Sequence, residues 1–104
     1  MEQQRIRLLE QFVKDEPDDP FNWFALALEQ MKFDRAKALE TFEYVLTRHP
    51  DYLPTYYHAG SLYQGIGNQE RAVSILNAGV DLARRLGDKK TLSELRMLLD
   101  DWVD

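Results

Sequence analysis

The chain repeats itself every 33 to 34 residues, and this period constrains its fold more than any other feature of the sequence. The pairs that recur after 33 residues are Pro17 and Pro50, Trp23 and Tyr56, Ala27 and Gly60, and Gln30 and Tyr63. The pairs that recur after 34 residues are Ala38 and Ala72, Phe42 and Leu76, and Val45 and Gly79. Such a period indicates stacked units of paired elements, each of which buries its apolar face only against its neighbours.

Six segments have the pattern of amphipathic helices. Apolar residues recur in them at three- and four-residue spacing, turn signals separate them, and no sustained two-residue alternation occurs. The expected helices extend over about residues 3–14, 20–32, 34–48, 53–64, 68–86 and 88–104. Asp18 or Asp19 is expected to cap the second helix, because a carboxylate oxygen accepts readily from the first backbone amides of a helix. The sequence therefore predicts an all-α protein.

Within this period the chain resembles a small two-repeat member of the tetratricopeptide repeat (TPR) family, whose pattern combines aromatic residues, small residues and a closing proline. The first unit matches the pattern with Trp23, Leu26, Ala27, Ala38, Phe42, Val45 and Pro50. The second unit matches with Tyr56, Gly60, Tyr63, Gly67 and Ala72. The departures are Gln30 in an aromatic position, Phe33 in place of the turn glycine, and Arg84 in place of the closing proline.

The small residues explain how the helices of each pair approach one another. Two helices pack closely only where a side chain is nearly absent, so we expect Ala27 opposite Ala38 and Gly60 opposite Ala72, with aromatic residues filling the wider gaps. The resemblance implies a right-handed α-solenoid, or superhelix, of antiparallel helix pairs. Such an array needs terminal helices with a polar outer face.

The terminal segments fit the role of such flanking helices. Leu9 and Phe12 align with Phe42 and Val45 at the 33-residue offset, so the first helix is interpreted as the second half of an incomplete repeat. The last helix has an apolar stripe of Leu92, Leu95, Leu99 and Trp102 and an opposite face with Lys90, Glu94, Arg96 and Asp101. We expect one domain over 1–104, divided into an N-terminal helix (1–16), repeat 1 (19–50), repeat 2 (51–86) and a capping helix (88–104).

Charge and composition limit the classes of partner. Thirteen Lys and Arg against eighteen Asp and Glu give a net charge of −5, which would repel nucleic acid. The absence of cysteine excludes disulfides, thiolate metal sites and a cysteine nucleophile. No stretch reaches the roughly 20 apolar residues of a membrane span, and the charged N-terminal stretch differs from a signal peptide. We therefore expect a cytoplasmic protein that binds neither nucleic acid nor membrane.

The resemblance implies that the first helix of each pair lines a concave face that receives a peptide. The residues projected onto or near this face are Phe24, Leu28, Met31, Tyr57, His58, Ser61 and Gln64. Two alternatives stay open: the apolar members are exposed to a partner, or a terminal helix covers them. The clamp of Lys, Arg and Asn with which some family members hold a peptide carboxylate is missing, because Phe24, Leu28, Tyr57 and Ser61 stand in those positions.

Other candidate sites have simpler explanations. His49 and His58 have no second imidazole at helical spacing, so no metal site is predicted. The acidic run at 15–19 lacks the glycine and glutamate of a calcium loop and lies where anionic caps are favoured. The glycines of the 65–67 segment follow a helix rather than a strand, which indicates a turn and not a phosphate site.

The sequence thus predicts a protein-protein interaction module or scaffold, without catalysis and without a cofactor. The alternative is a homo-oligomer, a homodimer in the simplest case, that pairs through the same apolar face. An enzyme would require a pocket with convergent polar groups. A deep cleft around His58 with a carboxylate in contact would favour that third interpretation.

Overall fold

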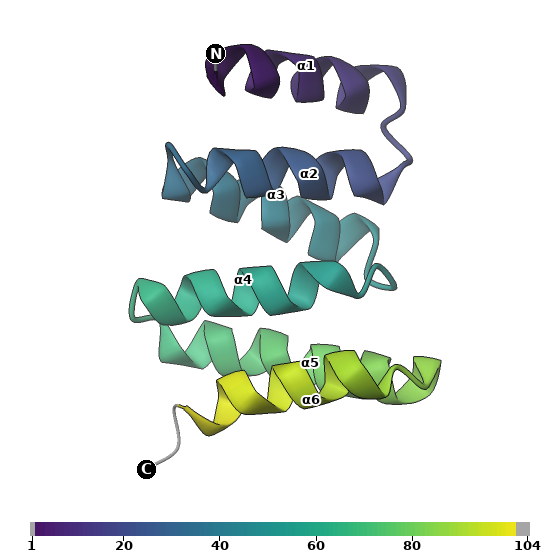
Figure 1. Ribbon diagram of the computed structural model, residues 1–104, viewed down its shortest axis with the longest axis vertical. Coiled ribbons are helices and arrows are strands. Elements are labelled where there is room, and N and C mark those ends of the chain that lie inside the picture. The colour runs from purple at the N-terminus through teal and green to yellow at the C-terminus, as the bar shows by residue number, and fades with distance from the viewer. Residues whose placement is uncertain (1, 102–104) are drawn as a thin grey trace. The chain divides into compact units, whose positions relative to one another are not determined.

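The computed structural model describes residues 2–101, and Figure 1 shows the course of the chain. Within this range the chain forms six helices and no strand. The helices are α1 (Glu2–Asp15), α2 (Pro20–Gln30), α3 (Arg35–Arg48), α4 (Pro54–Gly65), α5 (Gln69–Leu86) and α6 (Lys89–Asp100). The prediction of an all-α helical repeat is confirmed. Trp102, predicted as part of the last apolar stripe, lies outside the described residues.

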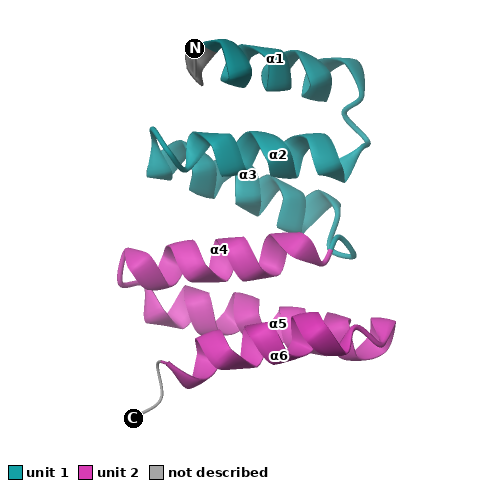
Figure 2. Cartoon of the chain, viewed as in Figure 1, with its two compact units in different colours: residues 1–52 teal, residues 53–104 magenta. Residues whose placement is uncertain are grey.

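The chain divides into two compact units, shown in different colours in Figure 2. Unit 1 comprises residues 1–52 and contains α1, α2 and α3, whereas unit 2 comprises residues 53–104 and contains α4, α5 and α6. The interpretation of the whole chain as one domain, with the subdivision given above, stays a prediction. No helix in residues 2–101 combines the length and the apolar character needed to cross a membrane.

Side-chain caps set the starts of four helices. Asp19, Asp34, Asn68 and Asp88 each accept a hydrogen bond from a backbone amide in the first turn of the helix that follows. The sequence left Asp18 and Asp19 as candidates for the cap of α2, and the structure shows that the cap is Asp19. An oxygen in this position satisfies one of the orphan amides of the first turn, which explains the carboxylate directly before α2.

The end of α5 reflects the missing proline of the repeat. With Arg84 in that position, the helix continues to Leu86 and reaches 18 residues. Gly87 ends it in the left-handed conformation with φ 72°, and the backbone amide of Asp88 donates to the carbonyl of Ala83. Glycine adopts this conformation without the steric penalty of a side chain, so it replaces proline as the stop signal.

In unit 1, α2 packs against both α1 and α3. Ala27 and Ala38 are fully buried, as are Phe42 and Val45, because the two alanines leave room for the aromatic ring and the branched side chain. Trp23 packs on Tyr44 with ring centroids 4.3 Å apart, and its Nε1 donates to the carbonyl of Pro17 at 2.8 Å. The aromatic position of the repeat thus also fastens the turn before α2.

Gln30 occupies a second aromatic position of the repeat and is buried, with 5% of its surface exposed. The hydroxyl of Thr41 in α3 donates to Oε1 of Gln30 at 2.6 Å, and Thr41 is itself buried. A buried amide oxygen without a partner would be costly. The polar pair therefore substitutes for aromatic packing at the same place between the two helices.

In unit 2, α5 packs against both α4 and α6. A methyl group at Gly60 would collide with the side chain of Leu76, which is the nearest neighbour of this glycine, whereas the repeat had placed Ala72 opposite it. At Gly79 an added Cβ would lie 2.6 Å from Cβ of Tyr56 and 3.1 Å from Cδ1 of Leu95. Gly79 is thus the point where α4 and α6 both reach α5.

We expect Gly79→Ala to destabilise the protein by about 1–3 kcal/mol, because Cβ of Tyr56 is attached to the backbone and cannot move aside cheaply. The matched control is Gly65→Ala, since nothing lies within 4 Å of a Cβ at Gly65. Alanine favours the helix over glycine by about 0.5–1 kcal/mol, so this control should be neutral or stabilising. Urea denaturation followed by circular dichroism measures both values, and equal effects of the two substitutions would contradict the close contact at Gly79.

Thr41→Val should lower the free energy of unfolding by about 1–3 kcal/mol, because it leaves the buried oxygen of Gln30 without its donor. The double variant Thr41→Val with Gln30→Leu removes both polar groups and should recover most of that loss. The same denaturation experiment measures the coupling between the two positions. Additive effects would show that the hydrogen bond contributes nothing.

Candidate functional site

In unit 1 the predicted wall residues lie beside α1. Phe24 is buried, with 8% of its surface exposed, and its ring contacts Tyr52 edge-on with centroids 5.6 Å apart. Leu28 and Met31 are half-buried. Phe24 and Leu28 line a cleft of about 380 Å³ together with residues of α1, including Leu9. Residues of α1 thus border the same cleft as Phe24 and Leu28, and the two alternatives left open by the sequence stay predictions.

An ion-paired carboxylate holds α1 on α2. Glu29 is buried, and its Oε1 lies 3.2 Å from Nε of Arg5 while its Oε2 lies 3.3 Å from Nζ of Lys32. A buried carboxylate is tolerated when such partners compensate its loss of hydration. The cations beside the cleft between α1 and α2, Arg5 and Lys32, are therefore already paired with Glu29.

In unit 2 the predicted wall residues have different surroundings. Tyr57 and His58 are half-buried and face a groove between α4 and α6. Gln64 donates from Nε2 to the carbonyl of Leu98 at 2.8 Å, so this side chain fastens α6 to α4. Ser61 is half-buried and does not line the groove. The structure therefore brings two of the four predicted residues together and uses a third within the fold. Contact of all seven residues with a partner stays a prediction.

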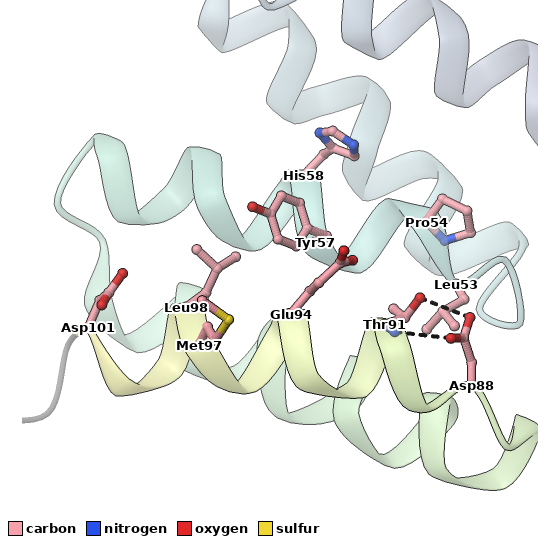
Figure 3. Close-up of a pocket in the computed structure, with 10 residues that line it drawn as sticks. All are labelled: Leu53, Pro54, Tyr57, His58, Asp88, Thr91, Glu94, Met97, Leu98 and Asp101. Atoms are coloured by element: carbon pink, nitrogen blue, oxygen red, sulfur yellow. Dashed lines mark hydrogen bonds between the residues drawn. The ribbon is translucent and has the colours of Figure 1, made fainter.

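The groove of unit 2, shown in Figure 3, has a volume of about 640 Å³. From the start of α4 it is lined by Leu53, Pro54, Tyr57 and His58, and from the cap and one face of α6 by Asp88, Thr91, Glu94, Met97, Leu98 and Asp101. Tyr57, Met97 and Leu98 supply apolar surface. Met97 is 66% exposed, so its flexible, polarizable side chain is available to a ligand.

The electrostatics of the groove are acidic. Asp88, Glu94 and Asp101 are spaced along α6, and no Lys or Arg is among the described residues that line the groove. The backbone amide and the hydroxyl of Thr91 donate to Asp88 and hold the pKa of this carboxyl below its usual value, so it stays charged at neutral pH. The basic residues of α6, Lys89, Lys90 and Arg96, do not line the groove.

His58 is half-buried beside the groove. Burial lowers the pKa of His58, because desolvation disfavours the charged imidazole. Desolvation, rather than a neighbouring carboxylate, sets the direction of this shift. Among residues 2–101, no three His, Asp or Glu side chains are grouped so that they could hold a metal ion.

Sequence reasoning missed the part that α6 plays in the groove. It assigned this helix to a cap and placed Glu94 and Asp101 on a solvated face. The residues from Asp88 to Asp101 that line the groove recur at three- and four-residue spacing, which marks one face of a helix. That signal was present in the sequence, but only the packing of α6 beside α4 shows that this face borders a groove.

Comparison with known proteins agrees with the helical-repeat class that the fold defines. The sequence profile of the tetratricopeptide repeat matches residues 23–52. The crystal structure of a tetratricopeptide repeat domain protein from Salinibacter ruber is 41% identical, with a TM-score of 0.72 over 77% of this chain and 91% of that one. A solution NMR structure of a tetratricopeptide repeat domain protein from the same organism is 40% identical, with a TM-score of 0.74 over 80% and 85%.

The chain belongs to the tetratricopeptide repeat family. A third solved structure, a MamA RS-1 ArsTM double mutant, is similar in fold, with a TM-score of 0.75 at 22% identity over 95% of this chain and 55% of that one. No curated protein matches the sequence. The family assignment made from the 33-residue period is thereby confirmed.

The lowered pKa of His58 predicts a pH dependence of stability. The unfolded chain binds a proton at His58 with a pKa near 6.5, and the folded chain binds it only at lower pH. The unfolded state therefore holds more protons just below pH 6.5, and the free energy of unfolding should fall as the pH drops through this window. Urea denaturation at pH 7 and pH 5.5 should show a smaller fall for His58→Gln than for the wild type. An unchanged difference would contradict the prediction.

Proposed function

We propose that the chain is a cytoplasmic protein-protein interaction module that binds a peptide segment of a partner on the face formed by the first helices of its repeats. Proteins of this family generally act in protein-protein interactions and are typically non-enzymatic scaffolds, and this coarser description applies to the fold. The proposal extends it to a binding site in unit 2, the groove between α4 and α6.

The observation that carries the proposal is the exposed apolar surface inside this groove. Met97 projects from α6 with two thirds of its surface accessible, and Tyr57 and Leu98 line the same groove. Burying apolar surface is favourable by about 25 cal/mol per Å². The groove also falls within the roughly 300–1,000 Å³ of ordinary ligand sites. A peptide side chain inserted between α4 and α6 would bury the exposed apolar surface of the groove.

We further propose that the module catalyses nothing and needs no cofactor. Proteins of this family are typically non-enzymatic, and binding of a peptide requires no proton transfer. Its partner is a protein or peptide rather than nucleic acid, because the acidic groove and the net charge of −5 would repel a phosphate backbone.

We expect Met97→Ala to weaken binding of a selected peptide about 5- to 10-fold, because less apolar surface is buried on association. A random peptide library displayed on phage would first be enriched on the wild-type protein. Titration of the enriched peptides against the wild type and Met97→Ala then measures the loss. Alanine is a strong helix former, so the substitution should leave α6 folded.

The matched control is Leu86→Ala, which truncates another exposed apolar side chain of unit 2 that does not line the groove. It should bind the peptides as tightly as the wild type. Light scattering of all three proteins tests the alternative from the sequence, a homodimer. A doubled mass that Met97→Ala reduces to that of the monomer, with no peptide enriched on the wild type, would overturn the proposal in favour of self-association.

A further inference from the structure

We propose that the groove between α4 and α6 selects a polyproline II segment with Lys or Arg at every third position and apolar residues between them. This inference rests on the proposed function and names the class of peptide that the site takes. It is argued from the charge, the spacing and the lining of the groove in unit 2.

The charge of the groove is of one sign. Asp88, Glu94 and Asp101 are the acidic residues among the described residues that line it, and no Lys or Arg lies among these. Both carboxylate oxygens of Asp88 accept from Thr91, at 3.0 Å from its amide and 2.8 Å from its hydroxyl, so this charge is held in one orientation. A cationic side chain is attracted to such a row, whereas an acidic peptide is repelled.

The spacing of the carboxylates indicates the conformation of the ligand. At a rise of about 1.5 Å per residue, the backbone positions of Asp88 and Glu94 lie roughly 9 Å apart along α6, and those of Glu94 and Asp101 roughly 10.5 Å apart. A polyproline II helix advances about 9.3 Å in three residues and returns its side chains to the same side. A β-strand returns its side chains every two residues, after about 6.6 Å, and matches the row less well.

The lining of the groove suits the residues between the basic positions. Tyr57 of α4 and Met97 of α6 both line it and offer apolar surface. Aromatic-lined grooves are the sites that receive polyproline II segments, because this conformation is preformed and loses little entropy on binding.

The test uses synthetic peptides and the full chain. The probe is the peptide Lys-Leu-Pro-Lys-Leu-Pro-Lys with a fluorescent label, compared with a peptide of the same composition that has its three lysines adjacent. A third peptide has Glu in place of each Lys, and a fourth is a longer helix-forming sequence with Lys at seven-residue spacing. Fluorescence anisotropy at low and at physiological salt measures each affinity.

We expect the first peptide to bind at least 10-fold tighter than the Glu peptide and about 3-fold tighter than the peptide with adjacent lysines, with affinity falling as salt increases. Glu94→Gln should weaken the first peptide about 3- to 5-fold. Glu70→Gln removes an exposed carboxylate of the same unit that does not line the groove, and it should leave binding unchanged. Asp88 is not substituted, because its loss would also remove the cap of α6.

Three results would overturn the inference. The first is equal weakening by Glu94→Gln and Glu70→Gln, which would indicate net charge alone. The second is preference for the seven-residue spacing, which would indicate a helical ligand. The third is that the phage library yields peptides without basic residues, and that Met97→Ala weakens their binding. In that case the proposed function stands and only the charge preference fails. Failure of the proposed function itself is distinguished by the absence of any enriched peptide.

Discussion

The close approach of paired helices at positions without a side chain is the constraint on which the rest of the structure depends. In unit 2, Tyr56 of α4 and Leu95 of α6 both rest against Gly79 of α5, where no Cβ would fit. In unit 1, the fully buried Ala27 and Ala38 have the same effect between α2 and α3. Because interiors pack as densely as organic crystals, these gaps set the distances at which every other side chain of the two pairs must fit.

A residue that departs from the repeat pattern is tolerated where its polar groups find partners or where a nearby residue performs the missing task. Gln30 stands in an aromatic position, yet its oxygen accepts from the hydroxyl of Thr41 and both residues are buried. Arg84 replaces a closing proline, and Gly87 ends α5 three residues later through a left-handed conformation. The family pattern is thus a set of physical tasks, such as filling a gap or stopping a helix, that different residues can perform.

The terminal helices contribute more than protection of the ends. In unit 1, the ion pair between Arg5 and Glu29 links α1 to α2 beside the cleft that Phe24 lines. In unit 2, α6 buries Leu95 on one side and presents Glu94 and Met97 to the groove on the other. An amphipathic helix that packs through one face leaves its opposite face to define a neighbouring surface. The acidic and apolar character of the groove is therefore a property of α6.

The sequence by itself determined the helices, the cap of the second helix and the family, because hydrophobic period, capping residues and the return of Trp23 as Tyr56 are local or periodic signals. It also placed Tyr57 and His58 on or near the face that is expected to bind a peptide. Only the tertiary structure decided that Phe24 is buried, that Gln64 holds α6, and that Asp88 through Asp101 border a groove. The physical reason is that these properties depend on which side chains of distant helices meet, and helical periodicity specifies a face without specifying its neighbour.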